Sequence, residues 1–216
     1  MNSKEFIARR AAKFFSDGDL INLGIGLPTM VANYIPDGID IWIDSENGVI
    51  GLSGSPAEGE EDLNLVDASG TPATLRTGGC CFDSFTSFGL IRGGHVAFTI
   101  LGAYEVDEEG NLANWTVPGK TTAGMGGAMD LVSGARQVLI TMTHTDKDGS
   151  PKILKRCTLP LTAAHEVDYI ITELCVIKVT PNGLLLQELA PGITAEEVIS
   201  KTGAKLILPA EIGCME

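Results

Sequence analysis

The first part of the chain alternates between segments typical of helices and segments typical of buried strands, and this alternation constrains the fold more than any other feature. Residues 3–16 carry apolar side chains near helical spacing, and residues 19–26 form an apolar run that ends in glycines. Pro28 suits the first turn of a helix over 28–35, and residues 40–44 form the next strand. This order predicts an α/β fold with an open, mixed, partly parallel sheet and flanking helices.

The rest of the chain continues the pattern. A polar, acidic, turn-rich stretch over 53–64 predicts a surface loop, and a helix over 194–203 should begin at the capping residue Thr194. Pro-Asn-Gly between the last two expected strands indicates a hairpin. No linker, internal repeat or low-complexity tract interrupts the chain, so we expect one domain over residues 1–216. The further strands are expected over residues 95–106, 135–142, 168–180 and 183–189.

Charge and cysteine content exclude several classes of protein. The formal net charge of −13 argues against non-specific nucleic-acid binding, because phosphates would be repelled. The charged N-terminal segment and the lack of a long apolar stretch predict neither a signal peptide nor a membrane span. Five cysteines without a C-x-x-C pair argue against a disulfide framework or a zinc site and favour a reducing cytoplasm. Adjacent Cys80 and Cys81 are expected to be buried, unpaired thiols.

Two glycine-rich segments are candidate binding loops. The segment around Gly24 and Gly26 follows a strand, but Thr29 stands where a dinucleotide fingerprint needs its third glycine. Glycines at 124, 126 and 127 precede a short helical run, and backbone N–H groups at such a start can stabilise an oxyanion. On this stretch alone, a sharp turn without function is favoured. The three separate histidines, His95, His144 and His165, predict no metal site.

The stretch DIWIDSENGVIG, residues 40–51, places Glu46 directly after an apolar strand. Asn47-Gly48 between two apolar runs is a strong hairpin pattern, in which Glu46 would only flank a turn. A carboxylate at the end of a buried strand also lies at the edge where open α/β sheets place ligands. The residues alone leave these two interpretations about even.

Five ordered blocks decide between them: NLGIGLPTMVANYIP, SENG, SFGLIRGGHVAFTILGAYEVDEEGNLANWTVPGK, GMGGAMDLV and KILKRCTLPLTA. In this order and at about this spacing they resemble the β subunits of family I CoA-transferases over nearly the whole chain. The sequence is most similar to subunits of bacterial acetate, butyrate or acetoacetate CoA-transferases. It is also similar to the C-terminal half of succinyl-CoA:3-oxoacid CoA-transferase.

This resemblance implies an activity and a site. Coenzyme A would pass between a short-chain acyl-CoA (acetyl-, butyryl- or acetoacetyl-CoA) and a free carboxylic acid, in ping-pong fashion, through a glutamyl-CoA thioester. Glu46 would be the nucleophile, and Gly127 would supply a backbone N–H beside the reacting carbonyl. No metal and no cofactor would be needed, since coenzyme A is a substrate. The residues implied to contact substrate or coenzyme A are Asn22, Gly24, Gly26, Asn47 and Gly126.

The resemblance also implies a separate α subunit of similar fold and an α2β2 heterotetramer in the cytoplasm. Alternatives remain open: a 3-oxoadipate or succinyl-CoA:3-oxoacid CoA-transferase β subunit, an acyl-CoA hydrolase, or a non-catalytic module that binds acyl-CoA or a sugar phosphate. The sequence departs from the family pattern at Asp44, where relatives often carry Gln or His. It also departs near Arg76, which could pair with an acid substrate or with Asp67. These departures leave the identity of the substrate open.

Overall fold

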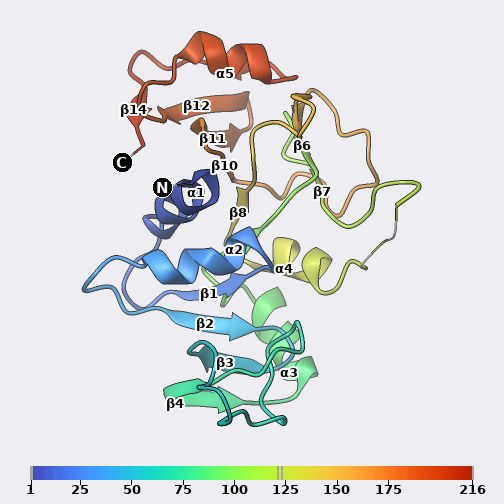
Figure 1. The fold of residues 1–216 in the computed structure, drawn as a ribbon. Coiled ribbons are helices and arrows are strands. Elements are labelled where there is room, and N and C mark those ends of the chain that lie inside the picture. The colour runs from blue at the N-terminus through green and yellow to red at the C-terminus, as the bar shows by residue number, and fades with distance from the viewer. Residues whose placement is uncertain (1, 121, 123, 216) are drawn as a thin grey trace.

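The computed structural model describes residues 2–120, 122 and 124–215, and one long mixed sheet runs through it (Figure 1). The helical segments are α1 (Ser3–Ala12), α2 (Leu27–Met30), the 3₁₀ turn η1 (Val31–Tyr34), α3 (Ser84–Arg92), α4 (Ala128–Gly134) and α5 (Ala195–Lys201). The strands of the first half are β1 (Leu20–Leu23), β2 (Trp42–Ser45), β3 (Val49–Leu52), β4 (Leu75–Cys81), β5 (Phe98–Leu101), β6 (Glu105–Asp107) and β7 (Leu112–Ala113). Those of the second half are β8 (Gln137–Thr141), β9 (Ile153–Leu154), β10 (Tyr169–Ile171), β11 (Cys175–Thr180), β12 (Gly183–Leu189), β13 (Leu206–Ile207) and β14 (Gly213–Cys214).

The large sheet has the strand order β13-β12-β11-β10-β8-β5-β1-β2-β3-β4, and β14 pairs with β12 beside this path. Its centre, from β10 to β2, is parallel, whereas β3, β4, β11 and β12 are joined through antiparallel pairs. The predicted α/β class with a mixed, partly parallel sheet is therefore confirmed.

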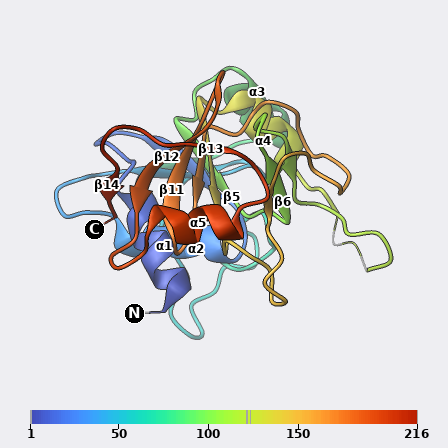
Figure 2. The same cartoon turned by 90° about the horizontal axis from the view of Figure 1, so that it is seen from above.

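Helices cover both faces of this sheet. In Figure 2, α1 and α2 lie on one side of the strands and α3 and α4 on the other. The core follows the period of two along each strand, because successive side chains point to opposite faces. In β8, Leu139 packs with the α1 side, whereas Val138 and Ile140 pack with the α4 side. The apolar runs of the central strands are continuous for this reason: both faces are buried.

The chain reverses its direction of travel across the sheet at β1. From β1 it moves to β2 on one side, and it later returns to β5 on the other side, in register with Ile21 opposite both Ile43 and Phe98. In open α/β sheets, ligands bind outside the carboxyl ends of the strands at such a switch point. The fold therefore points to the ends of β1, β2 and β5, where Gly24 N–H donates to the Ile100 carbonyl at 2.8 Å.

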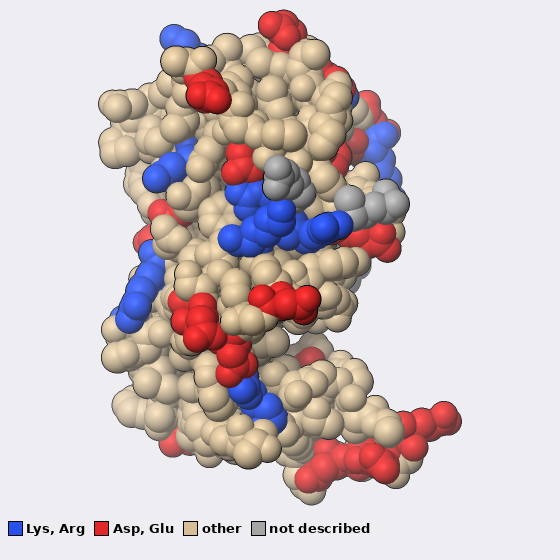
Figure 3. Space-filling model, turned by 90° about the vertical axis from the view of Figure 1, so that its left-hand side faces the viewer, with Lys and Arg blue, Asp and Glu red and all other residues tan. Residues whose placement is uncertain are grey.

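Several sequence predictions are confirmed. The hairpin between β11 and β12 turns at residues 181–182, and the Thr194 side chain accepts a hydrogen bond from Glu197 N–H at the start of α5. The acidic loop is exposed, and Figure 3 shows an acidic tract at the lower end of the molecule, where the connection between β3 and β4 lies. Within the described residues, no helix is long and apolar enough to cross a membrane.

Other predictions were wrong in detail. The run 95–106 divides into β5 and β6, and β6 belongs to a small second sheet with β7 and β9. The run 168–180 divides into β10 and β11, which pair antiparallel around a tight turn. The expected helix over 28–35 is one turn of α-helix followed by η1.

The two adjacent cysteines are the clearest correction. Cys80 and Cys81 are free, as predicted, but exposed, whereas burial was expected. They lie on β4, which pairs only with β3 in the order of the sheet and therefore forms its edge. Small and apolar neighbours in the sequence do not distinguish an edge strand from a buried one.

Candidate active site

Glu46 lies at the tip of a hairpin that the local sequence forms for backbone reasons. β2 and β3 pair antiparallel, with Ser45 opposite Val49, and Gly48 N–H donates to the Ser45 carbonyl at 2.9 Å. Gly48 has φ +121°, and a Cβ there would collide with the Phe82 carbonyl oxygen. Only glycine fits such a position. The hairpin interpretation of the Asn-Gly pair is therefore confirmed, and the run after it, which looked like a poor partner strand, is β3.

The connection between β3 and β4 is hydrogen-bonded to this hairpin. Asn47 Nδ2 donates to the Val66 carbonyl at 2.8 Å, and Ala68 N–H donates to Ser45 Oγ at 2.9 Å. Both bonds join the hairpin to the connection between β3 and β4. The Asn47 side chain thus holds the loop in place, which gives it a structural role in addition to any contact with a substrate.

Asn22 connects the hairpin tip to the centre of the sheet. This residue of β1 is 1% exposed, and its Nδ2 donates to Asp44 Oδ2 at 3.2 Å, to Glu46 Oε2 at 3.2 Å and to the Asp44 carbonyl at 3.3 Å. Three oxygen acceptors around one nitrogen fix the orientation of the amide, because a flipped amide would set its oxygen against them. Asn22 Oδ1 has no hydrogen-bond partner among the described residues.

Asp44 is the second carboxyl group of the site. It is 3% exposed, and burial raises its pKa to about 6. The hydrogen bond from Asn22 opposes this rise in the pKa, and the nearby charge of Glu46 adds to it. A group with this pKa changes its charge near neutral pH, next to a partly buried Glu46.

Gly127 brings a second loop to the same place. It is the residue before the first turn of α4, and a Cβ built on it would lie 3.3 Å from Glu46 Cγ and 3.1 Å from Phe88 Cζ. Glycine thus permits an approach that is closer than an ordinary side chain allows. The loop after residue 123 and the hairpin tip, about 80 residues apart in the sequence, meet across the carboxyl ends of the central strands.

The structure brings together Asn22, Glu46 and Gly127 of the residues predicted from the sequence. Gly24 follows β1, and a Cβ there would lie 2.9 Å from Leu101 Cδ2, so this glycine serves close packing of two strand ends. Gly26 and Gly126 have positive φ angles of 91° and 55°, and a Cβ on either would meet nothing within 4 Å. Both therefore border open space at this end of the sheet.

One candidate residue lies away from the site, and one residue of the site was missed. Arg76 pairs with Asp40, with nitrogen–oxygen distances of 2.6 and 2.8 Å, and its guanidinium stacks on the Trp42 ring 4.1 Å from the centroid. Arg76 therefore links β4 to the start of β2. The pairing with Asp67 considered from the sequence is wrong. Phe88, whose ring edge touches Gly127, was missed, since it is one of several apolar residues of α3 and no motif distinguishes it.

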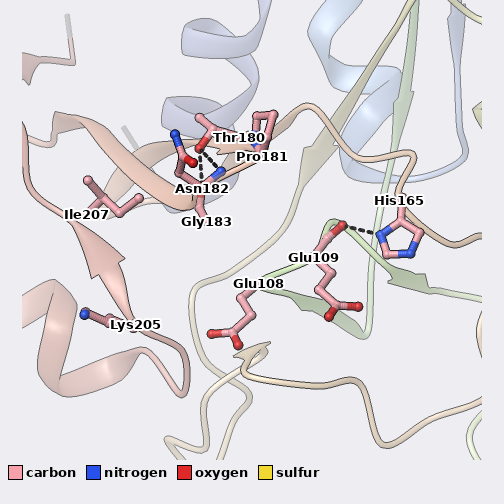
Figure 4. A pocket seen from close by; sticks show the side chains of 9 residues that line it. All are labelled: Glu108, Glu109, His165, Thr180, Pro181, Asn182, Gly183, Lys205 and Ile207. Carbon is pink, nitrogen blue, oxygen red and sulfur yellow. Dashed lines mark hydrogen bonds between the residues drawn. The ribbon is translucent and has the colours of Figure 1, made fainter.

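One pocket in the described part of the chain lies away from Glu46. It has a volume of about 510 Å³ and lies between the turn that joins β11 to β12 and the turn after β6. Five strand spacings of roughly 4.8 Å separate β11 from β2, so this pocket and the hairpin lie roughly 24 Å apart across the sheet. Figure 4 shows its lining residues, which are Glu108, Glu109, His165, Thr180, Pro181, Asn182, Gly183, Lys205 and Ile207.

The site around Glu46 is built from carboxyl, amide and backbone groups. It consists of one partly buried carboxylate, a buried carboxyl group, a shared amide and a glycine-rich loop. Such a set can attack a carbonyl carbon through a carboxylate oxygen. Within the described ranges, no group of three histidine, cysteine, aspartate or glutamate side chains is arranged to hold a metal ion.

Comparison with known proteins identifies the family. The family model described as coenzyme A transferase matches residues 4–201. The chain is 54% identical over 208 residues to the acetate CoA-transferase subunit beta of Haemophilus influenzae, covering 96% of this chain and 93% of that protein. It is 47% identical over 202 residues to a subunit of a probable succinyl-CoA:3-ketoacid coenzyme A transferase of Bacillus subtilis, covering 94% of each chain.

A solved structure shares the fold. The apoenzyme of an acyl-CoA transferase from Escherichia coli O157:H7 superposes with a TM-score of 0.80 at 23% identity. The alignment covers all of this chain and 43% of that one, so the present chain spans less than half of that protein. With the family model over most of its length and relatives above 45% identity, the chain belongs to the coenzyme A transferase family and is a CoA-transferase of the beta-subunit type.

Proposed function

We propose that this chain transfers coenzyme A between an acyl-CoA and a free carboxylic acid through a covalent thioester on Glu46. The observation that carries the proposal is the position of the Glu46 carboxylate. It lies at the carboxyl end of the central strands, is held by Asn22 Nδ2 at 3.2 Å and is bordered by Gly127. A partly exposed carboxylate with one hydrogen-bond donor is suited to nucleophilic attack.

The steps balance without a cofactor. A Glu46 oxygen attacks the acyl-CoA carbonyl carbon, the carbon–sulfur bond breaks, and a mixed anhydride and CoA thiolate form. The thiolate then attacks the glutamyl carbonyl of the anhydride, which leaves a glutamyl-CoA thioester and releases the first acid as its carboxylate. The second acid carries out the same steps in reverse and leaves as the new acyl-CoA.

Each step passes through a tetrahedral oxyanion, and backbone N–H groups stabilise such charges well. We assign this task to the loop at Gly127, because its backbone lies beside Glu46 Cγ. Coenzyme A also has a long portion that does not react, and its binding energy can be used to hold the reacting groups together. The open glycine positions 26 and 126 leave room for it at this edge.

For the substrate we propose a short-chain acyl-CoA, with acetate as one of the acids. The relative from Haemophilus influenzae is named for acetate and has the higher identity of the two relatives described above. A 3-oxoacid is the second candidate, because the relative from Bacillus subtilis is named for succinyl-CoA and a 3-ketoacid. A panel of acyl-CoA donors (acetyl, butyryl, acetoacetyl, succinyl) against free acids distinguishes the two.

We further propose that an α subunit covers this edge, as in an α2β2 heterotetramer. The similar chain from Haemophilus influenzae is named as a beta subunit. Large apolar side chains are exposed near the site: Ile25 after β1 at 78%, Phe85 on α3 at 88% and Met129 on α4 at 52%. Exposed apolar groups around an open half-site favour a protein partner that completes it.

Trapping the thioester tests the mechanism. The chain co-expressed with its α subunit is incubated with acyl-CoA and no acceptor acid, and intact-mass spectrometry should show the added mass of CoA on this chain. Hydroxylamine should remove it. Glu46→Gln should fold normally, because an amide is nearly isosteric, but should form no adduct and lose almost all transfer. Glu46→Asp should be slower by roughly a hundredfold, since misplacement of a nucleophile by about 1 Å has that effect.

Two results would contradict the proposal. If Glu46→Gln retains the adduct, and deamidation back to glutamate is excluded by mass, another residue is the nucleophile. If the wild-type pair releases CoA in water as fast as it transfers it to acids, the enzyme is a hydrolase. The same assay with this chain alone should show no turnover, and full activity without the α subunit would contradict the proposed partner.

A further inference from the structure

Asp44 is a buried carboxyl group next to the nucleophile, and the steps above give it no role. Neighbouring strands hold it from both sides, with Asn22 opposite it on β1 and Ile50 opposite it on β3. Among the described residues, Glu46 is the charged group whose field acts on Asp44. Asp44 Oδ2 and Glu46 Oε2 each lie 3.2 Å from the same Asn22 nitrogen, so the two oxygens are no more than twice that distance apart.

We propose that the Asp44 carboxylate drives Glu46 toward its thioester, because the repulsion between the two negative charges disappears when Glu46 becomes a neutral acyl group. The inference rests on the proposed function and concerns the regulation of that site. In the exchange, the Glu46 carboxylate becomes a glutamyl-CoA carbonyl, and the negative charge leaves with the released acid. Asp44 itself forms no bond to the substrate and acts only through its field and through Asn22.

The shared amide strengthens this effect. In the free enzyme, Asn22 Nδ2 serves both carboxylates at once. After thioester formation the carbonyl of Glu46 is a weaker acceptor than a carboxylate, so the amide is left to Asp44. In the thioester, the Asn22 amide therefore donates to one ionised carboxylate. In the free enzyme, the same amide is shared between two ionised carboxylates.

The size of the effect follows from Coulomb's law. Two unit charges about 6 Å apart near a protein surface repel strongly, and the partial exposure of Glu46 reduces the effect through solvent screening. With this discount, we expect ionised Asp44 to raise the equilibrium constant for thioester formation by about fivefold to tenfold.

The charge state of Asp44 makes this constant depend on pH. In the free enzyme, burial, and to a smaller extent the charge of Glu46, raise the pKa of Asp44 to about 6. Loss of the Glu46 charge in the thioester lowers that pKa, so the free enzyme binds more protons than the thioester does. The constant should therefore rise as the pH increases from about 5 to 7 and level off above that range.

The test measures an equilibrium on the assembled enzyme. The α/β pair is mixed with acetyl-CoA and acetate at fixed ratios at pH 5.5, 6.5 and 7.5, and intact-mass spectrometry gives the fraction of this chain that carries CoA. Asp44→Asn keeps the shape and removes the charge. It should lower the constant at pH 7.5 by about fivefold to tenfold and abolish its rise with pH. Asp37→Asn, an exposed aspartate before β2, is the matched control and should behave as the wild type.

The outcomes separate this inference from the proposed function. If the wild type forms the adduct and Asp44→Asn shows the same constant and the same pH dependence, the role of Asp44 is refuted and the thioester mechanism stands. If Asp44→Asn fails to fold, the wild type alone decides, because a constant that is flat from pH 5.5 to 7.5 overturns the inference. If no adduct forms in the wild type at any pH, the proposed function fails and this inference fails with it.

Discussion

Replacement of Gly127 by alanine should slow catalysis and leave the stability of the fold nearly unchanged. The backbone at Gly127 has φ −84° and ψ 6°, a conformation that residues with a side chain also adopt in turns. The added Cβ would lie 3.3 Å from Glu46 Cγ and 3.1 Å from Phe88 Cζ, closer than ordinary contact distances of 3.4 to 4 Å. The Glu46 side chain or the loop must therefore move by a few tenths of an ångström.

The expected magnitudes follow from these distances. Since misplacement of a nucleophile by about 1 Å costs roughly a hundredfold in rate, a shift of a few tenths should slow thioester formation by about threefold to tenfold. For stability, lower chain entropy in the unfolded state contributes about 0.5 to 1 kcal/mol in favour of alanine. Overpacking against the Phe88 ring opposes it by a similar amount. The free energy of unfolding should change by less than about 1 kcal/mol.

Stopped-flow mixing of the α/β enzyme with acyl-CoA measures the rate of CoA release, and denaturant unfolding measures the stability. Gly89→Ala, in α3 one residue from Phe88, is the control for stability, because its Cβ would meet nothing within 4 Å. That control should stabilise the chain by up to about 1 kcal/mol. A wild-type rate in Gly127→Ala would refute the contact between this loop and Glu46. A large loss of stability at an unchanged rate would show that Gly127 serves the fold and not the reaction.

Two further predictions concern a buried histidine and two exposed cysteines. Burial lowers the pKa of His144 to about 4, and its ring nitrogens bond Thr172 and Thr202 hydroxyls at 3.0 and 2.9 Å. Because the unfolded chain binds this proton near pH 6.5, stability should fall as the pH drops from about 6.5 to 4, by up to about 3 kcal/mol. Urea unfolding at pH 7.5 and 5 should show a smaller fall in His144→Gln, and an equal fall in both proteins would contradict this. Replacement of both Cys80 and Cys81 by alanine should leave transfer within about twofold of the wild type, since both are exposed at a sheet edge; a large loss of transfer in a folded variant would indicate a reactive thiol.

The His144 prediction needs the comparison of wild type and variant, because protonation of Asp44 changes the stability of the fold in the opposite direction. The pKa of Asp44 is raised to about 6 in the folded chain, so its protonation below that pH favours the fold. The difference between His144→Gln and the wild type at each pH cancels this contribution.

The class of the fold, a mixed and partly parallel sheet with flanking helices, could be predicted because it depends on local patterns. Helix, strand, helix and strand in the first 44 residues can form only a few compact arrangements, and the cap at Thr194 and the turn at 181–182 are local backbone preferences. Division of the runs 95–106 and 168–180 could not be predicted, because an apolar run looks the same whether it forms one strand or turns midway into a second strand. Arg76 shows the same limit, since its partner Asp40 is 36 residues away.

The candidate site was predicted in part for a different reason. Local patterns did not decide whether Glu46 only flanks a turn or takes part in the reaction. Only the five ordered blocks favoured a part in the reaction. The structure shows that these interpretations are compatible, since Glu46 is part of a hairpin and also lies beside Gly127. The contact with Phe88 and the amide shared between Asp44 and Glu46 depend on how three distant segments meet, which no local pattern reports.

The collision that a side chain at residue 48 would cause has a consequence for how this family is recognised in other genomes. Gly48, the glycine of S-E-N-G, is required because a side chain there would collide with the Phe82 carbonyl oxygen, whatever reaction the protein performs. No steric constraint of this kind requires a glutamate at position 46, two residues earlier. A homologue that has lost transfer activity should therefore keep the glycine and be free to change the glutamate. Sequence searches can use this difference: the glycine is a marker of shared ancestry, and the glutamate separates working transferases from inactive descendants.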